Sequence, residues 1–440
     1  MSADTRHIFE TSAVAALAAI RRRDVSTQDL TWRFLARIGQ DNGHLHALRH
    51  VMAERAMEEA AALDRRIRAG EDLPPLAGLP VVVKENCDTA GVPCSAGLAF
   101  RTSHIPARDS WITARLRAAG AIIVGLSVSD PGAFSTRTAE VTHPWDPDLT
   151  VGGSSGGSAA ALAAGLCLGA IGTDTGGSIR IPSACCGTVG LKPTFDALPM
   201  DGIFPLVKSL DHVGPMARSV EDVKVLWRAL ALASPAPANS PRRIGFDPSW
   251  VECADAPIRE AMTIALERLA ARNVTAVEVR LPALDDVVAM HGRIFLTEAT
   301  AYHCAHHPDD IAAYPALAQE WFAAARQMSV AAYVDACVER AAMTKAVDDV
   351  LQTVDAILAP TLCVTRPHKM AETLRVAGVE QDFTMGLVRL TCLFDHTGHP
   401  VLSLPVRGAA DPLASSLQVI GPQGGEEHAI SVADLIQSAF

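Results

Sequence analysis

The stretch from Gly152 to Arg180 reads GGSSGGSAAALAAGLCLGAIGTDTGGSIR, with one glycine-flanked serine near each end and a short apolar run between them. The serines are Ser154 and Ser178. Glycine permits backbone angles that are closed to other residues, so a serine among glycines can expose its hydroxyl beside several backbone N–H groups. A serine hydroxyl and nearby backbone N–H groups are the two parts of an acyl-transfer site, the nucleophile and the oxyanion hole.

Strands and helices alternate on both sides of this stretch. Apolar runs at Leu79–Val83 and Ala121–Val124 predict buried strands, and Ile112–Ala119 and Ser158–Gly165 predict helices. Near-continuous apolar strands that alternate with helices indicate an α/β fold with a mainly parallel sheet.

The two ends of the chain have different patterns. The first seventy residues are predicted to be helical, with a capping box at Ser26–Asp29 and a second helix at Met52–Ile67. Ser234–Pro241 reads SPAPANSP and predicts a surface connection, which separates either two domains or two halves of one sheet. The later elements are expected as strands at Arg243–Phe246, Val274–Leu281, Ala356–Ala359 and Val401–Pro405, and as helices at Pro257–Arg272, Val220–Leu232 and throughout Leu284–Val354.

Composition excludes several classes of protein. The chain has 440 residues, 49% of them hydrophobic, and a net charge of −11, which disfavours direct binding to nucleic acid. The start of the chain has no apolar signal core, and the run from Ala159 to Gly172 is shorter than a membrane span. Ten scattered cysteines without a CxxC pair are expected as buried free thiols. We therefore expect a soluble cytoplasmic protein.

Lys84 and Ser154 each have more than one interpretation from the sequence. Lys84 follows Val81–Val83 directly, so it is either a solvated lysine at the sheet edge or a buried base with a lowered pKa. Ser154 also matches GxSxG, the nucleophile elbow of α/β-hydrolases. The same glycines are compatible with a plain turn before a helix or with an anion-binding loop, although neither the Rossmann nor the P-loop spacing is present.

The second serine has charged neighbours. Two glycines before Ser178 can turn consecutive N–H groups toward one anion, and Asp174 can orient that loop. Arg180 pairs either with a substrate carboxylate or with an internal carboxylate, and the internal pair is favoured. His303, His306 and His307, near Asp309 and Asp310, fit a solvated helix end better than a metal site, and His396 and His399 fit packing or loop roles.

The long motifs around both serines resemble the amidase signature family. These motifs are GGSSGGSAAALAAG from Gly152 and GTDTGGSIRIPSACCGTVGLKPT from Gly172. Gly78–Asn86 (GLPVVVKEN), Ser209–Pro215 (SLDHVGP) and Thr397–Pro405 (TGHPVLSLP) are similar to further family segments.

The resemblance implies roles for the residues. Ser178 is the expected nucleophile, Ser154 the bridging serine after a cis peptide from Gly153, and Lys84 the base. Thr175, Gly176, Gly177 and Ser178 are expected to supply oxyanion-hole N–H groups, with Gly153, Ser155, Asp174 and Arg180 in support. Neither a metal nor an organic cofactor is implied, and a homodimer is compatible with the resemblance.

The resemblance also implies the architecture. It is one large α/β/α domain over residues 1–440, with a mixed, mainly parallel central sheet covered by helices and a helical N-terminal region. Residues 70–232 are expected to form the catalytic core, and residues 243–440 to complete the sheet and the substrate pocket.

The implied activity is hydrolysis of a linear C–N bond, in an amide or a carbamate or urea-type small molecule, through an acyl-enzyme. Three alternatives stay open: an amidotransferase subunit with glutaminase activity and a partner protein, an esterase that uses Ser154, and an anion-binding module. Departures from the family pattern weaken the amidotransferase interpretation. They are Phe195–Ala197, Gly125–Val128 and the pair Asp395–His396. Ser127–Thr138, Phe195–Ser209 and Leu284–Gln327 are expected to shape a pocket for a neutral amide or carbamate.

Overall fold

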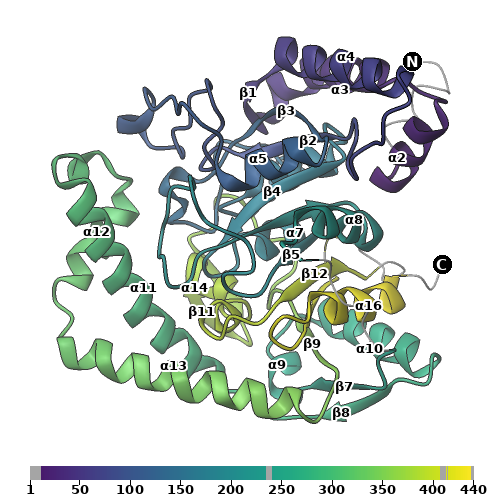
Figure 1. Ribbon diagram of the computed structural model, residues 1–440. Helices are drawn as coiled ribbons and strands as arrows, with labels where there is room; N and C mark the ends of the chain where they lie inside the picture. Colours follow the sequence, from purple (N-terminus) through teal and green to yellow (C-terminus); the bar gives the residue numbers. More distant parts are fainter. Residues whose placement is uncertain (1–10, 234–239, 407–412, 414, 438–440) are drawn as a thin grey trace.

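A computed structural model describes residues 11–233, 240–406, 413 and 415–437, arranged around one eleven-stranded sheet (Figure 1). The surface connection predicted at Ser234–Pro241 lies outside the described residues except for its last two positions. The strands of the sheet are β1 (Leu48–Val51), β2 (Pro80–Lys84), β3 (Ile122–Ser127), β4 (Gly169–Asp174), β5 (Val189–Lys192), β6 (His212–Ala217), β7 (Arg243–Phe246), β8 (Thr275–Glu278), β9 (Ala356–Pro360), β12 (Val401–Pro405) and β13 (Ser416–Ile420).

The sheet is mixed, and it includes strands from both halves of the chain. Its order is β1-β3-β2-β4-β6-β5-β12-β13-β9-β7-β8. Parallel pairs form two groups, β2 with β3 and β4, and β7 with β8 and β9. The strands between these groups pair antiparallel, as do β1 and β3. The predicted mixed α/β fold is confirmed. A separate hairpin joins β10 (Thr373–Val376) to β11 (Val379–Asp382).

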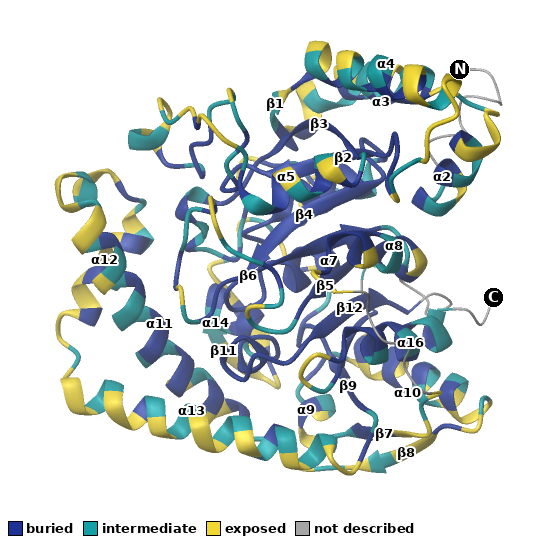
Figure 2. Ribbon diagram, in the orientation of Figure 1, coloured by how far each residue is buried: buried dark blue, intermediate teal, exposed yellow. Residues whose placement is uncertain are grey.

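Helices cover both faces of the sheet. The helices are α2 (Ala13–Arg22), α3 (Thr27–Leu45), α4 (Ala53–Arg68), α5 (Trp111–Ala118), α6 (Gly156–Ala163), α7 (Arg180–Cys186), α8 (Val220–Leu230), α9 (Pro248–Glu252), α10 (Ala256–Ala270), α11 (Leu284–His306), α12 (Ala316–Ala325), α13 (Val330–Leu351), α14 (Phe383–Val388), α15 (Leu393–His396) and α16 (Glu426–Gln437). Val81 and Val83 pack in the cluster that contains α5, α8, α10 and α16, whereas Val82 packs toward α6. This alternation is the period of two expected of a strand buried on both faces, and Figure 2 shows the central strands buried.

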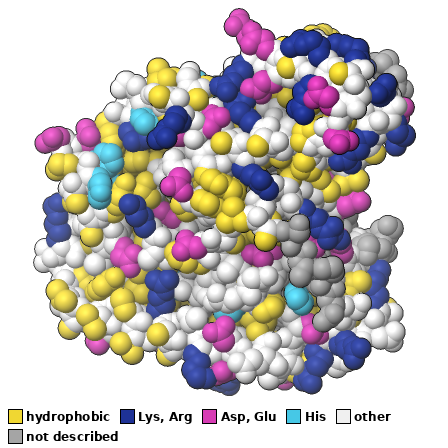
Figure 3. Space-filling view, viewed as in Figure 1, with side chains coloured by type: hydrophobic (Ala, Val, Ile, Leu, Met, Phe, Trp, Pro, Cys, Tyr) yellow, Lys and Arg dark blue, Asp and Glu magenta, His cyan; other side chains and the backbone are white. Residues whose placement is uncertain are grey.

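The N-terminal helices form as the sequence predicts. The Ser26 hydroxyl accepts a hydrogen bond from the Asp29 backbone N–H at 3.0 Å, which confirms the cap of α3. Arginines close α2 at Arg21 and Arg22 and α4 at Arg65, Arg66 and Arg68, where positive charge complements the helix dipole. Figure 3 shows several basic side chains over this end of the molecule, with acidic side chains among them.

The helical region expected at Leu284–Val354 is three helices and a short 3-10 turn instead of one run. Pro308 opens the 3-10 turn at Pro308–Ala313, and Pro315 directly precedes α12. Proline has no backbone N–H, so it begins helices more readily than it continues them. Ser329 then caps α13 by accepting from the Ala332 N–H at 3.1 Å. These helices form an arm beside the sheet, with α13 largely exposed on its outer face (Figures 1 and 2).

The cysteines agree with the expectation of free thiols. All ten cysteines are free, and most of them are buried. Within the described ranges, no helix is both long enough and apolar enough to cross a membrane.

Candidate active site

Lys84 is the last residue of β2 and is fully buried. Its Nζ donates to Ser154 Oγ at 2.8 Å and to Thr173 Oγ1 at 2.9 Å. Burial lowers the pKa of Lys84 to about 8, although Cys87 and the carboxylates of Asp130, Asp174 and Asp211 oppose that shift. Of the two interpretations of Lys84, the solvated lysine is therefore wrong.

Ser154 lies in the loop before α6 and is fully buried. The Gly153–Ser154 peptide bond is cis, as the resemblance implies. Gly153 leaves no room for a side chain, because a Cβ atom there would lie 2.6 Å from both Arg137 N and Thr136 C. The Ser154 carbonyl accepts from the Asp130 N–H at 3.1 Å, which ties the serine loop to the segment after β3.

Ser155 connects the two serine loops. Its Oγ donates to Thr173 O at 3.2 Å and accepts from Thr173 N at 3.2 Å. Its N–H donates to the Ser178 carbonyl at 3.3 Å. Ser154 therefore contacts Lys84 at the end of β2, and the next residue, Ser155, contacts the Ser178 loop, which follows β4.

Asp174 ends β4 and holds the Ser178 loop. Its carboxylate accepts N–H groups from Gly177 at 2.6 Å, Ile179 at 3.0 Å and Arg180 at 3.3 Å. Gly177 has φ +134°, and a Cβ atom there would lie 2.3 Å from Thr391 Oγ1. Because the Gly177 N–H already donates to Asp174, the oxyanion donor expected from Gly177 is not free in this conformation. Thr175, Gly176 and Ser178 are left as the expected donors.

Arg180 has an internal role. Its guanidinium is fully buried and donates to Asp174 Oδ1 at 2.9 Å, to Asp395 Oδ2 at 2.7 Å and to the Thr391 carbonyl at 2.8 Å. Burial alone would raise the pKa of Asp174, but Arg180 outweighs burial and holds that pKa well below its usual range. Burial raises the pKa of Asp395 well above its usual range. The favoured internal pairing is confirmed, and Asp395 joins β4 to the second half of the chain through Arg180.

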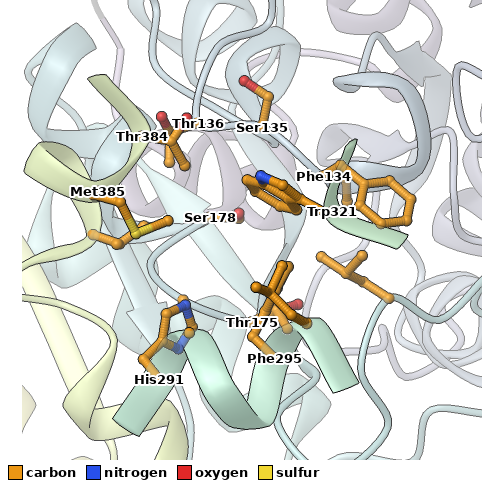
Figure 4. Close-up of a pocket in the computed structure, with 16 residues that line it drawn as sticks. Phe134, Ser135, Thr136, Thr175, Ser178, His291, Phe295, Trp321, Thr384 and Met385 are labelled. Atoms are coloured by element: carbon orange, nitrogen blue, oxygen red, sulfur yellow. The ribbon is translucent and has the colours of Figure 1, made fainter. Parts of the chain in front are cut away.

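Ser178 faces a cavity of about 120 Å³, shown in Figure 4. Its hydroxyl makes no hydrogen bond to any described residue. Apolar and aromatic side chains dominate the wall, which contains no Asp, Glu, Lys or Arg among the described residues. The lining residues include Ser135, Thr136, His291, Phe295, Trp321 and Met385.

Two functional candidates were not predicted from the sequence. Thr173 accepts from Lys84 and also from Asn86 Nδ2 at 3.1 Å, so it fixes the lysine amine. His291 lines the cavity, and its Nδ1 lies 2.9 Å from Nε2 of His396. Thr173 is in β4, where the alternation of side chains along a strand could have indicated which way it faces. His291 lies within Leu284–Gln327, which the sequence predicted to shape the pocket, but no signal singled out this residue.

The histidines of the predicted solvated helix end separate. His306 is exposed and His307 partly buried, but His303 is buried and contacts the Tyr314 hydroxyl at 2.9 Å through Nδ1. For His303 the solvated interpretation is therefore wrong, because the aromatic rings of Phe134, Phe204 and Phe322 surround it. Within the part of the chain that the structure describes, no three His, Cys, Asp or Glu side chains are grouped as metal ligands.

Comparisons with known proteins cover nearly the whole chain. A family model described as Amidase matches residues 29–430. A glutamyl-tRNA(Gln) amidotransferase subunit of Prochlorococcus marinus (strain MIT 9313) is 32% identical over 93% of each chain. A crystal structure of an amidase has 30% identity and a TM-score of 0.88 over 97% of this chain and 99% of that one. A chain solved in work on the evolutionary origins of an s-triazine catabolic enzyme has 29% identity and a TM-score of 0.90, covering 97% of this chain and 98% of that one.

Proposed function

The chain belongs to the amidase family, and from that premise we propose that it hydrolyses a linear C–N bond of a small neutral molecule through an acyl-enzyme on Ser178. The observation that carries the proposal is the buried Lys84 amine, 2.8 Å from Ser154 Oγ and behind the loop that presents Ser178 to the cavity. Amide bonds of small molecules are the leading substrates, and carbamates and ureas contain the same C–N bond.

The proposed reaction begins with a proton relay. Neutral Lys84 accepts the Ser154 hydroxyl proton while Ser154 accepts the proton of Ser178, after the Ser178 hydroxyl has turned from the cavity toward Ser154. Ser178 Oγ then bonds to the substrate carbonyl carbon. The relay runs in reverse to protonate the leaving nitrogen, and the C–N bond breaks. A pKa of about 8 leaves a useful fraction of Lys84 neutral near neutral pH.

Water completes the cycle. The same relay removes a proton from a water molecule, which attacks the acyl carbon and releases the acid and Ser178. In both halves the N–H groups of Thr175, Gly176 and Ser178 are the proposed donors to the negative oxygen that develops on the carbonyl. Losing one such donor commonly costs about a hundredfold or more in rate.

The wall of the cavity supports a neutral substrate. A charged group placed there would lose its hydration without gaining an ion pair, because no Asp, Glu, Lys or Arg of the described residues lines the cavity. Phe134, Phe295, Trp321 and Met385 favour an aromatic or aliphatic group.

A glutaminase that works within an amidotransferase complex is the second candidate, because a relative with an amidotransferase name matches nearly the whole chain. The glutaminase reaction requires free glutamine, whose ammonium and carboxylate both need partners. The uncharged wall argues against that substrate. An esterase that uses Ser154 is disfavoured further, because Ser154 is fully buried and its hydroxyl pairs with Lys84 and, among the described residues, with no histidine.

A fluorophosphonate probe mapped by mass spectrometry tests the assignment. We expect a label on Ser178 in the wild type and none in Lys84→Ala. Ser158→Ala is the control, because this buried serine donates to the Ile171 carbonyl outside the proposed relay. Labelling of Ser154, or full labelling of Lys84→Ala, would contradict the mechanism. Glutamine hydrolysis only after addition of a copurifying protein would favour the amidotransferase.

A further inference from the structure

His291 lines the cavity on the side of Gly176, and it contacts a second histidine, His396, which is not one of the lining residues. His291 comes from α11 and His396 from α15, and both are buried. The rings meet edge to face, with Nδ1 of His291 2.9 Å from Nε2 of His396. At this distance one of the two nitrogens donates a proton to the other.

The hydrogen bond between the rings fixes which nitrogen of His291 faces the cavity. Nδ1 points to His396, so the free nitrogen is Nε2. A Cβ atom at Gly176 would lie 3.2 Å from Cε1 and 3.4 Å from Nε2 of His291, which places this ring edge against the loop of Ser178. Nε2 has no hydrogen-bond partner among the described residues. It is therefore available to a molecule in the cavity.

The surroundings of His396 decide where the protons are. Its Nδ1 is buried and has no partner among the described residues. If His291 donated, His396 would have its proton on Nδ1, as a buried N–H without an acceptor. If His396 donates from Nε2, both rings take the Nε2–H form that neutral imidazole prefers in water, and only a lone pair of His396 is left unmatched. A buried N–H without an acceptor is the rarer arrangement in proteins, so the second arrangement is favoured.

The pair stays neutral. Neither ring has a hydrogen bond or ion pair to a carboxylate among the described residues, because the neighbouring Asp395 pairs with Arg180. Burial lowers the pKa of His291 to about 4 and the pKa of His396 well below its usual value. His291 therefore presents an uncharged N–H group in a wall that is otherwise mainly apolar.

The position of His291 assigns it to one side of the substrate. Ser135 and Thr136 lie against Gly153, beside Ser154, which must return the proton to the leaving nitrogen. In Figure 4, Ser135 and Thr136 are on one side of Ser178, and His291 is on the other. The leaving group thus faces Ser135 and Thr136, and the acyl group faces His291.

On the basis of the proposed hydrolase function, we infer that His291 is a specificity-determining residue whose Nε2–H donates to an uncharged oxygen acceptor in the acyl part of the substrate. His396 is a positioning residue that keeps the proton of His291 on Nε2. The substrate class is then a neutral amide or carbamate with an oxygen in the acyl chain close to the scissile carbonyl.

A series of 4-nitroanilides with one leaving group tests this inference. The acyl chains have equal length and contain only carbon, an oxygen next to the carbonyl (a carbamate), or an oxygen one atom further (an alkoxyacetyl group). An oxygen in the acyl chain also changes the intrinsic reactivity of the carbonyl, so the kcat/KM ratio of each oxygen-containing chain to the all-carbon chain is compared between variants. For one oxygen-containing chain we expect this ratio to be roughly tenfold to a hundredfold higher in the wild type than in His291→Phe, the usual effect of one well-placed hydrogen bond. Part of the difference should return in His291→Gln.

His303→Phe is the matched control, because it makes the same change to a buried histidine of the same helix outside the cavity wall. It should keep the wild-type preference, whereas His396→Leu should weaken it. The same kcat/KM ratios in the wild type and in His291→Phe would overturn the inference and would leave the roles of Lys84 and Ser178 unaffected. Loss of probe labelling at Ser178 would instead overturn the proposed function.

The proton position has a test that needs no turnover. In protein with ¹⁵N-labelled histidine, the ring signals of His291 are assigned by their loss in His291→Phe. We expect a protonated Nε2 and an unprotonated Nδ1 at neutral pH, and a mixture of the two forms in His396→Leu. A proton on Nδ1 of His291 in the wild type would refute the donor role.

Discussion

The rate of amide hydrolysis should follow the titration of Lys84. The relay needs the neutral amine, so activity is present above the pKa of Lys84 and is lost as the pH falls through it. With a pKa of about 8, the neutral fraction grows from about 9% at pH 7 to about 91% at pH 9, so kcat/KM should rise about tenfold and then level off. A lysine with the ordinary pKa of 10.5 would instead give a rise of about a hundredfold over this range, with no plateau.

The assay is the pH dependence of kcat/KM from pH 6 to 10 with a neutral 4-nitroanilide, which has no group that titrates in this range. Burial also raises the pKa of Asp130 to about 8, so Asp130→Asn is needed to separate the two groups. Removing this carboxylate removes a negative charge that favours the ammonium, and the rise should move to lower pH without disappearing. A profile that is flat, that climbs without a plateau to pH 10, or that loses its rise in Asp130→Asn would refute the reasoning.

Three further changes have definite expected results. Lys84→Met should be inactive yet more stable at pH 7, by about 3 kcal/mol, because lowering the lysine pKa from 10.5 in the unfolded chain to about 8 in the folded protein costs folding free energy. This gain in the free energy of unfolding, measured by chemical denaturation, should disappear above pH 10.5, where the lysine is neutral in both states. A gain that persists there would contradict this account. Asp174→Asn should lower the free energy of unfolding by about 3–5 kcal/mol, because it removes a negative charge that pairs with the buried Arg180 guanidinium. Asp434→Asn, which breaks the partly exposed pair with Lys224, should lower it by less than about 1 kcal/mol. Equal losses in the two variants would show that Asp174 is not a structural anchor. Gly177→Ala should lower both the free energy of unfolding and the probe labelling of Ser178, because its Cβ atom would lie 2.3 Å from Thr391 Oγ1. Gly70→Ala, also at positive φ but in open space, should cost about 1 kcal/mol of stability and leave labelling intact. Normal labelling of Gly177→Ala would contradict the need for a tightly packed Ser178 loop.

The sequence predicted those parts of the fold in which local pattern and burial agree. Val81–Val83 and Val401–Pro405 are apolar runs of strand length, and both are strands in the structure. The strands β5 and β6 have no such signal, because each contains poor strand formers. These are Gly190 and Lys192 in β5, and His212 and Pro215 in β6. Pairing with neighbouring strands stabilises them, and these contacts cannot be read from a local window.

The same division holds for the site. Glycine-rich turns and a lysine after three valines indicate Lys84, Ser154 and Ser178 from the sequence, and the internal pairing of Arg180 follows from the rarity of buried unpaired charge. The pair of His291 and His396 is a contact between residues more than a hundred positions apart, on helices that meet only in the folded chain. The use of the Gly177 N–H by Asp174 likewise depends on a loop conformation that the motif does not specify.

The origin of the cavity wall in two parts of the chain has an evolutionary consequence. The groups proposed for bond cleavage all come from residues 84–178, as do Phe134, Ser135 and Thr136 of the wall. The rest of the wall, including His291, Phe295, Trp321 and Met385, comes mainly from the helical arm and the segment around α14. Substitutions of these later wall residues can therefore change substrate choice while the groups proposed for bond cleavage stay in place, and drift around Ser178 is constrained by the pairing of Asp174 with Arg180. Diversification among descendants of such an enzyme is expected to concentrate in α11, α12 and α14, and a graft of these helices between relatives is a natural route to new specificity.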